Sequence, residues 1–201
     1  PGRIDFGIGT GFTARRTMGL GAIPLSDTRQ YVDRVRTLMR GETIEWDFEG
    51  HARKIRFLNP DVGLINVEDD VPLWFSAFGP KSKQLTADLK AGWLNFGTQG
   101  AAKRLEEMRE CWANAGHAPA DLEANLFFLG AVLTGDAATD DAKLMAEGGP
   151  GAAPMFHAFA DTVGAMGGRG VPEGPMGEIV NEYLEVHETY EPADARYLTN
   201  H

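Results

Sequence analysis

The segment from Val71 to Phe78 (VPLWFSAF) constrains the fold of this chain more than any other stretch, because it is a nearly continuous apolar run. Pro72 and Gly79 bound the run. A strand with one face in water alternates apolar and polar residues, whereas a continuous apolar run is typical of a strand covered on both faces. The segment therefore predicts a buried strand.

Strand and helix patterns alternate on both sides of this run. Further strands are expected at Arg3–Gly9, Trp93–Phe96 and Asn125–Thr134. Apolar residues at helical spacing predict helices between Ser26 and Gly41, between Pro80 and Gly92, and at Ala101–Ala115, Asp140–Glu147, Ala153–Gly164 and Met176–His187. Gly41, Gly92 and Gly116 are expected to end three of them. This alternation indicates an α/β fold with a parallel sheet.

Between the first helix and the apolar run, the hydrophobic pattern changes to period two. Ile44, Trp46 and Phe48 alternate with acidic residues, whereas Ile55 and Phe57 alternate with basic ones. Opposite charges facing each other across two strands stabilise an antiparallel pair. Residues 43–58 are therefore predicted to form a β-hairpin inserted into the α/β fold.

The strands that the sequence predicts are too few for a closed barrel. A (β/α)8 barrel needs eight strands and typically about 250 residues, whereas the chain has 201 residues. No repeat, low-complexity stretch or linker marks a second domain. We expect one partial domain over residues 1–201, with a helical C-terminal part at 138–201. A core strand directly after Pro1 suggests that the chain begins inside a domain.

Charge and composition exclude several classes of partner. The net charge of −10 disfavours nucleic acid, because phosphate-backbone binding needs clustered Lys and Arg. No apolar run approaches the roughly 18 to 20 residues that span a bilayer. Cys111 is the one cysteine, so no internal disulfide can form, which fits a cytoplasmic location. A small molecule is the expected partner.

A glycine-rich turn, Gly9-Thr10-Gly11, follows the first strand. Together with Ala14 it matches a loose dinucleotide-binding fingerprint. That fingerprint needs a helix at the turn to present its N-terminus to a pyrophosphate, but the next helical pattern begins only near Ser26. The sequence therefore disfavours a Rossmann site. It leaves two readings, a tight structural turn or backbone brought close to a flat ring or a phosphate.

A second turn, Phe78-Gly79-Pro80-Lys81-Ser82, joins the buried strand to a helix. Free backbone N–H groups at a helix start can bind an anion, and Lys81 and Lys83 could add positive charge. The alternative is a plain strand-to-helix turn with solvated lysines.

Other reactive side chains show no chemical pattern. Arg15 and Arg16 suit either a phosphate clamp or an ordinary surface. The five histidines have no metal-ligand spacing, so no metal is expected. Glu107 and its acidic neighbours are expected on the solvated face of a helix.

Taken in order, several of these segments resemble the luciferase-like superfamily. They are GRIDFGIGTGFTARRTMGL, KIRFLNP, VPLWFSAFGPK and LTADLKAGW, and the match extends roughly over residues 2–97. The chain is most similar to the methylenetetrahydromethanopterin-reductase-like members, which use FMN or coenzyme F420. The resemblance implies a luciferase-like TIM barrel, of which this chain contributes about the fourth to the seventh strand.

The resemblance also implies a chemistry, namely hydride transfer or monooxygenation on FMN or F420 lying across the carboxyl ends of the barrel strands. It assigns Thr10 and Gly11 to the turn near the cofactor ring. It assigns Phe78, Gly79, Lys81 and Ser82 to the turn near the cofactor phosphate. Phe12 stands where some deazaflavin relatives carry an acid, so no catalytic residue can be assigned.

An alternative within the same resemblance is a shortened, non-catalytic flavin-binding protein that dimerises. An incomplete barrel has open sheet edges, and open edges need covering. We therefore expect a homodimer.

Overall fold

The computed structural model describes residues 3–11, 14–15, 20–96, 100–128, 130–165 and 167–187. The chain divides into two compact units. The first contains Pro1–Thr10 and Ile23–Phe127, and the second contains Gly11–Ala22 and Phe128–His201. Whether both belong to one partial barrel domain stays a prediction.

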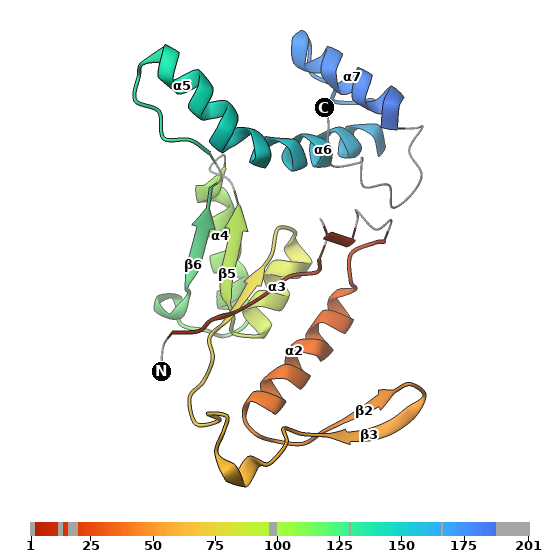
Figure 1. Cartoon of the computed structure of the whole chain (residues 1–201), viewed down its shortest axis with the longest axis vertical. Helices are drawn as coiled ribbons and strands as arrows, with labels where there is room; N and C mark the ends of the chain where they lie inside the picture. The colour runs from red at the N-terminus through yellow and green to blue at the C-terminus, as the bar shows by residue number, and fades with distance from the viewer. Residues whose placement is uncertain are drawn as a thin grey trace. The chain divides into compact units, whose positions relative to one another are not determined.

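The first unit is built on a parallel sheet of four strands in the order β1-β4-β5-β6 (Figure 1). The strands are β1 (Phe6–Ile8), β4 (Leu73–Ser76), β5 (Gly92–Phe96) and β6 (Ala124–Phe127). Phe75 on β4 pairs with Ile8 on one side and with Trp93 on the other. All three strand pairings are parallel, which confirms the α/β class predicted from the sequence.

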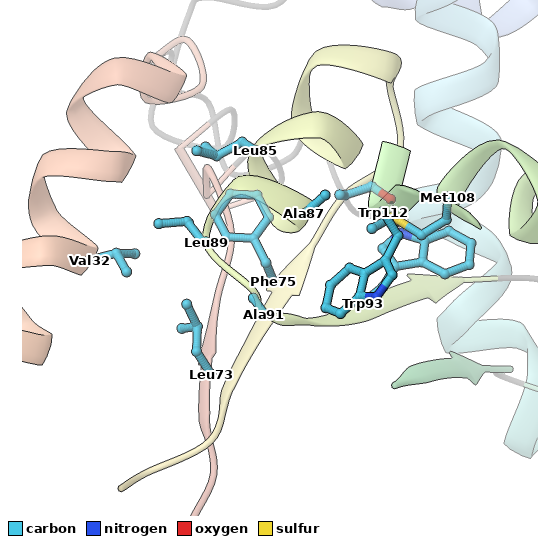
Figure 2. Close-up of a cluster of buried hydrophobic side chains, with 11 residues drawn as sticks. Val32, Leu73, Phe75, Leu85, Ala87, Leu89, Ala91, Trp93, Met108 and Trp112 are labelled. Carbon is cyan, nitrogen blue, oxygen red and sulfur yellow. Dashed lines mark hydrogen bonds between the residues drawn. The ribbon is translucent and has the colours of Figure 1, made fainter. Parts of the chain in front are cut away.

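Three long helices accompany this sheet, α2 (Leu25–Met39), α3 (Pro80–Asp88) and α4 (Ala101–Asn114), with short turns η1 (Pro60–Val62) and η2 (Pro119–Asp121). Their apolar faces and the strands bury one core, shown in Figure 2. The core contains Val32, Leu73, Phe75, Ala77, Leu85, Ala87, Leu89, Ala91, Trp93, Met108 and Trp112. Each large side chain buried there contributes roughly 1.5–3 kcal/mol of hydrophobic stabilisation.

Two of the three predicted helix ends are confirmed. Gly41 and Gly116 have φ angles of 75° and 80°, the left-handed conformation that glycine adopts without strain. Gly92 is different, because α3 already ends at Asp88 and the left-handed residue that follows it is Lys90, whose φ is 48°. Gly92 is instead the first residue of β5, and a Cβ atom there would lie 2.5 Å from Cε3 of Trp74. The close approach of that ring, not a helix end, requires glycine.

The predicted hairpin forms a separate antiparallel sheet of β2 (Ile44–Phe48) and β3 (His51–Ile55). Glu45 lies opposite Lys54, and their Oε1 and Nζ atoms are 3.8 Å apart. The acidic strand thus faces the basic strand as the sequence predicts.

The predicted buried strand at Asn125–Thr134 is wrong in both extent and burial. β6 ends at Phe127, and its four residues are all exposed. Leu126 and Phe127 remain 40% and 46% accessible. The physical reason is that no residue of β6 belongs to the hydrophobic core of the first unit, so no packed element covers its side chains there.

The second unit is helical, with α5 (Ala137–Lys143), η3 (Leu144–Gly148), α6 (Gly149–Ala165) and α7 (Pro175–His187). The helices predicted at Asp140–Glu147 and Ala153–Gly164 are confirmed as helical, but the expected loop between them is wrong, because α5, η3 and α6 follow one another without a break. The π-helical turn η3 ends at Gly148, and α6 begins at Gly149, so the two glycines lie within the continuous helical path. No helix in the described part of the chain is long and apolar enough to cross a bilayer.

Candidate functional site

The turns that follow β1 and β4 leave the same edge of the sheet, because the carboxyl ends of parallel strands share one edge. Gly9 lies against the end of β4, and a Cβ atom on Gly9 would be 3.3 Å from Cβ of Ser76. A larger residue at position 9 would therefore require Ser76 to shift by a few tenths of an ångström. Glycine here is explained by a close backbone approach.

The rest of the first turn is held by its own loop. The carbonyl oxygen of Thr10 accepts a hydrogen bond from the amide of Ile23 at 3.0 Å. Gly11 has a φ of 70°, and Nε of Arg15 donates to the carbonyl of Gly21 at 2.6 Å. The Nε group of Arg15, which the sequence suggested as part of a phosphate clamp, thus stabilises the loop instead. Arg16 lies outside the described residues.

The second turn presents a helix start to solvent. Gly79 is extended and precedes Pro80, the first residue of α3. The first bond of the helical ladder runs from the amide of Lys83 to the carbonyl of Gly79 at 3.0 Å. The amides of Lys81 and Ser82 therefore precede the ladder, at the positive end of the helix dipole.

Side chains add to the polar groups of this turn. The hydroxyl of Ser82 donates to the carbonyl of Gly79 at 2.9 Å and keeps its lone pairs for another donor. Lys81 is exposed. Phe78 is 58% accessible and leaves a flat apolar ring beside the turn.

Lys83 does not belong to this set, so neither of the two possibilities left open for it, added charge at the turn or a solvated lysine, holds. Its side chain is 3% accessible, and its Nζ atom lies 2.5 Å from Oε2 of Glu107 on α4. The hydrogen bond from Lys83 lowers the pKa of the Glu107 carboxyl. The expectation that Glu107 lies on a purely solvated face is therefore wrong as well. The spacing of Lys83 from buried Thr86 and Ala87, at i+3 and i+4, was the signal that placed it on the inner face.

Two further residues at this edge were missed by sequence reasoning. Trp93 and Asn95 on β5 both donate side-chain hydrogen bonds to the carbonyl of Ala77, at 2.9 Å and 2.8 Å. Ala77 immediately precedes the second turn. An asparagine inside an otherwise apolar strand (GWLNF) was the available signal, because a buried amide needs partners.

The donors at the second turn suit a phosphate group. They comprise the backbone amides of Lys81 and Ser82, which precede the helical ladder, and the exposed ammonium group of Lys81. Helix N-termini and lysine are both common phosphate ligands. Among the residues that the structure describes, no group of three His, Cys, Asp or Glu side chains could hold a metal ion.

Comparison with known proteins identifies the family. A family model described as luciferase-like monooxygenase matches residues 1–189. The chain belongs to the luciferase-like monooxygenase family. The resemblance found in the sequence segments is thereby confirmed.

Solved structures similar to this family member include two oxidoreductases. One is an F420-dependent secondary alcohol dehydrogenase in complex with an F420-acetone adduct, with 21% identity and a TM-score of 0.46 over 63% of this chain and 39% of that one. The other is monooxygenase RslO1 from Streptomyces bottropensis, with 17% identity and a TM-score of 0.45 over 92% of this chain and 68% of that one. The chain therefore spans well under half the length of the first. No curated protein sequence matches it.

Proposed function

We propose that this chain is part of an oxidoreductase that uses FMN or coenzyme F420, and that transfers hydride to or from a small-molecule substrate or carries out monooxygenation. The observation that carries the proposal is the family match over residues 1–189. The exposed donors of the second turn support it, because both cofactors contain a phosphate group. The bound cofactor would supply the redox chemistry, while the protein binds and orients it.

The second turn is the proposed phosphate site. The amides of Lys81 and Ser82, together with the ammonium group of Lys81, would bind the phosphate oxygens, and Phe78 and Gly79 would line the approach. The Ser82 hydroxyl could join them only by turning away from the carbonyl of Gly79. Thr10 and Gly11 would bring backbone close to the ring. Gly79 has open space around its Cα, so the backbone is accessible to a ligand there.

The proposed parent architecture is a luciferase-like (β/α)8 barrel. The four parallel strands of the first unit would be about its fourth to seventh strands, with the hairpin as an insertion. The order β1-β4-β5-β6, with long helices between β4, β5 and β6, supports this assignment. A cytoplasmic location fits this assignment and is proposed with it.

The second candidate is a shortened, non-catalytic flavin-binding protein that works as a homodimer. The exposed apolar side chains of β6, Leu126 and Phe127, favour it, because a second copy could cover them. Sedimentation of the 201-residue chain tests this candidate. A monomer at all concentrations would count against it.

The cofactor proposal is tested by titrating the chain with FMN and with F420 while following ligand fluorescence and protein melting. Lys81→Ala is expected to weaken binding of whichever cofactor binds by about tenfold or more, because a charge-assisted hydrogen bond contributes roughly 1.5–3 kcal/mol. Lys54→Ala is the matched control, since Lys54 is 77% accessible and lies on the hairpin.

Two results would contradict the proposal. If the chain binds neither FMN nor F420 saturably, it has no cofactor site of its own. Equal losses in the two lysine variants would show that Lys81 acts only through general charge, and the phosphate site would have to lie elsewhere.

A further inference from the structure

The carbonyl oxygen of Ala77 accepts hydrogen bonds from two buried side chains of the neighbouring strand. Nε1 of Trp93 lies 2.9 Å from it and Nδ2 of Asn95 lies 2.8 Å from it. The two donors are only 3% and 0% accessible. Because a carbonyl oxygen has two lone pairs, these bonds use its full capacity.

The rest of this network fixes the peptide on both sides. The amide of Ala77 donates to the carbonyl of Leu94 at 3.2 Å, one residue beyond the end of β4. The Oδ1 atom of Asn95 accepts from the amide of Phe96 at 2.8 Å, which sets the orientation of the Asn95 amide group. Since the peptide unit is planar, holding the carbonyl of Ala77 also sets the direction in which Phe78 leaves the strand.

The turn itself has little packing that could fix its direction. Only Phe78 and Gly79 separate Ala77 from the first residue of α3. Phe78 is 58% accessible, and a Cβ atom on Gly79 would have no neighbour within 4 Å. The carbonyl of Ala77 is therefore the anchor on the strand side of the turn, while the core contacts of α3 hold its helix side. Small displacements of binding groups cost affinity, because donors must match ligand atoms closely.

We propose that Trp93 and Asn95 are positioning residues, which act through the carbonyl of Ala77 to orient the amides of Lys81 and Ser82. The inference rests on the proposed function in that this turn holds the phosphate of the cofactor. Neither side chain touches the cofactor in this scheme.

The chain offers a matched pair of substitutions to test the inference. Trp93→Phe removes the indole donor to Ala77. Trp112→Phe removes an indole donor of the same kind, because Nε1 of Trp112 lies 2.9 Å from the carbonyl of Ala118. Both rings belong to the same core, where Figure 2 shows them with Met108. Both changes therefore remove one hydrogen bond and a similar volume.

The two variants are expected to lower the melting temperature by similar amounts but to differ at the turn. Trp93→Phe should weaken binding of FMN or F420 at least several-fold, whereas Trp112→Phe should leave the affinity unchanged. Backbone ¹⁵N relaxation should show greater mobility at Phe78, Gly79 and Lys81 in Trp93→Phe only. Asn95→Asp, which replaces the donor by an acceptor at nearly constant volume, should have the same effects on affinity and on mobility of the turn, with a larger loss of melting temperature because it buries a carboxylate.

The two readouts separate failure of this inference from failure of the proposed function. If wild-type chain binds neither cofactor, the proposed function fails, but the relaxation measurement still tests the positioning role without any ligand. Equal mobility of the turn in the two tryptophan variants would overturn the inference. So would an equal loss of cofactor affinity in both.

Discussion

β5 and β6 are neighbouring parallel strands in one sheet, yet their environments are opposite (Figure 1). Trp93 and Asn95 on β5 are almost fully buried, whereas all four residues of β6 are exposed. Both strands are apolar in sequence. The difference lies in what covers them, because residues of α3 and α4 share the core with β5. An apolar strand pattern thus predicts side chains that are more stable when buried. Whether they are buried depends on the elements that pack against the strand.

The segments that follow β4 and β6 are also held by different kinds of hydrogen bond. After β4, the uncharged side chains of Trp93 and Asn95 donate to the carbonyl of Ala77. After β6, the carboxylate of Asp140 accepts hydrogen bonds from the amide and hydroxyl of Thr134 and from the amide of Gly135, at 2.7–3.0 Å. The first arrangement contains no titrating group, whereas the second depends on the charge of a carboxylate.

A large effect is expected where β5 is tightly packed. Gly92→Ala would place a Cβ atom 2.5 Å from the ring of Trp74, and overpacking a core costs about 1–3 kcal/mol or more. We expect a loss at the upper end of that range, measured by denaturant unfolding. Gly7→Ala on β1 is the control, because a Cβ atom there would meet nothing within 4 Å.

Gly7→Ala should change the free energy of unfolding by less than about 1 kcal/mol. If Gly92→Ala is equally mild, the ring of Trp74 can move aside. The contrast between a tightly packed β5 and an open β6 would then be weaker than the structure indicates.

The second prediction uses pH to distinguish the uncharged hydrogen bonds to Ala77 from those to the carboxylate of Asp140. Hydrogen bonds from the backbone amide of Thr134, together with those from Gly135 and the Thr134 hydroxyl, lower the pKa of Asp140 below its ordinary value of 3.8. A lowered folded-state pKa stabilises the fold above that ordinary value, and the stabilisation is lost as the pH falls through the folded pKa. Stability of the second unit should therefore decrease with acidification below about pH 4.

Asp140→Asn should lower the stability of the second unit near neutral pH and should flatten this part of the acid dependence. Asp141→Asn, a change at the adjacent exposed acid, serves as the control. The measurement is thermal unfolding of the three proteins between pH 3 and pH 7, a range that spans the ordinary carboxyl pKa. An unchanged acid profile in Asp140→Asn would show that other carboxylates determine it.

Periodicity and backbone chemistry were enough to predict much of the fold. The parallel strands, the hairpin with its opposed charges, and the helix ends at Gly41 and Gly116 follow from patterns that act over a few residues. The family also follows from an ordered set of such segments. These features are local, so the sequence alone carries them.

The failures concern contacts between distant segments. Lys83 was considered either as added charge at a phosphate site or as a solvated lysine, but it pairs with Glu107, twenty-four residues away. Gly92 was expected to end a helix but accommodates the ring of Trp74 on another strand. Asn95 gave no hint of its partner, Ala77. In each case the deciding atom belongs to a neighbour in space that the local pattern does not specify.

The smallest expected effect on stability lies on β6 and tests the comparison most directly. Leu126 is 40% accessible and Leu73 on β4 is 4% accessible. Leu73→Ala should cost about 2–5 kcal/mol, the usual range for a buried leucine, whereas Leu126→Ala should cost less than about 1 kcal/mol. Unfolding of both variants at low protein concentration gives the two values.

If Leu126→Ala is as costly as Leu73→Ala, then β6 is covered in solution. Repeating the measurement over a hundredfold range of protein concentration would then identify the cover, because a cost that grows with concentration indicates a second copy and a constant cost indicates the same chain.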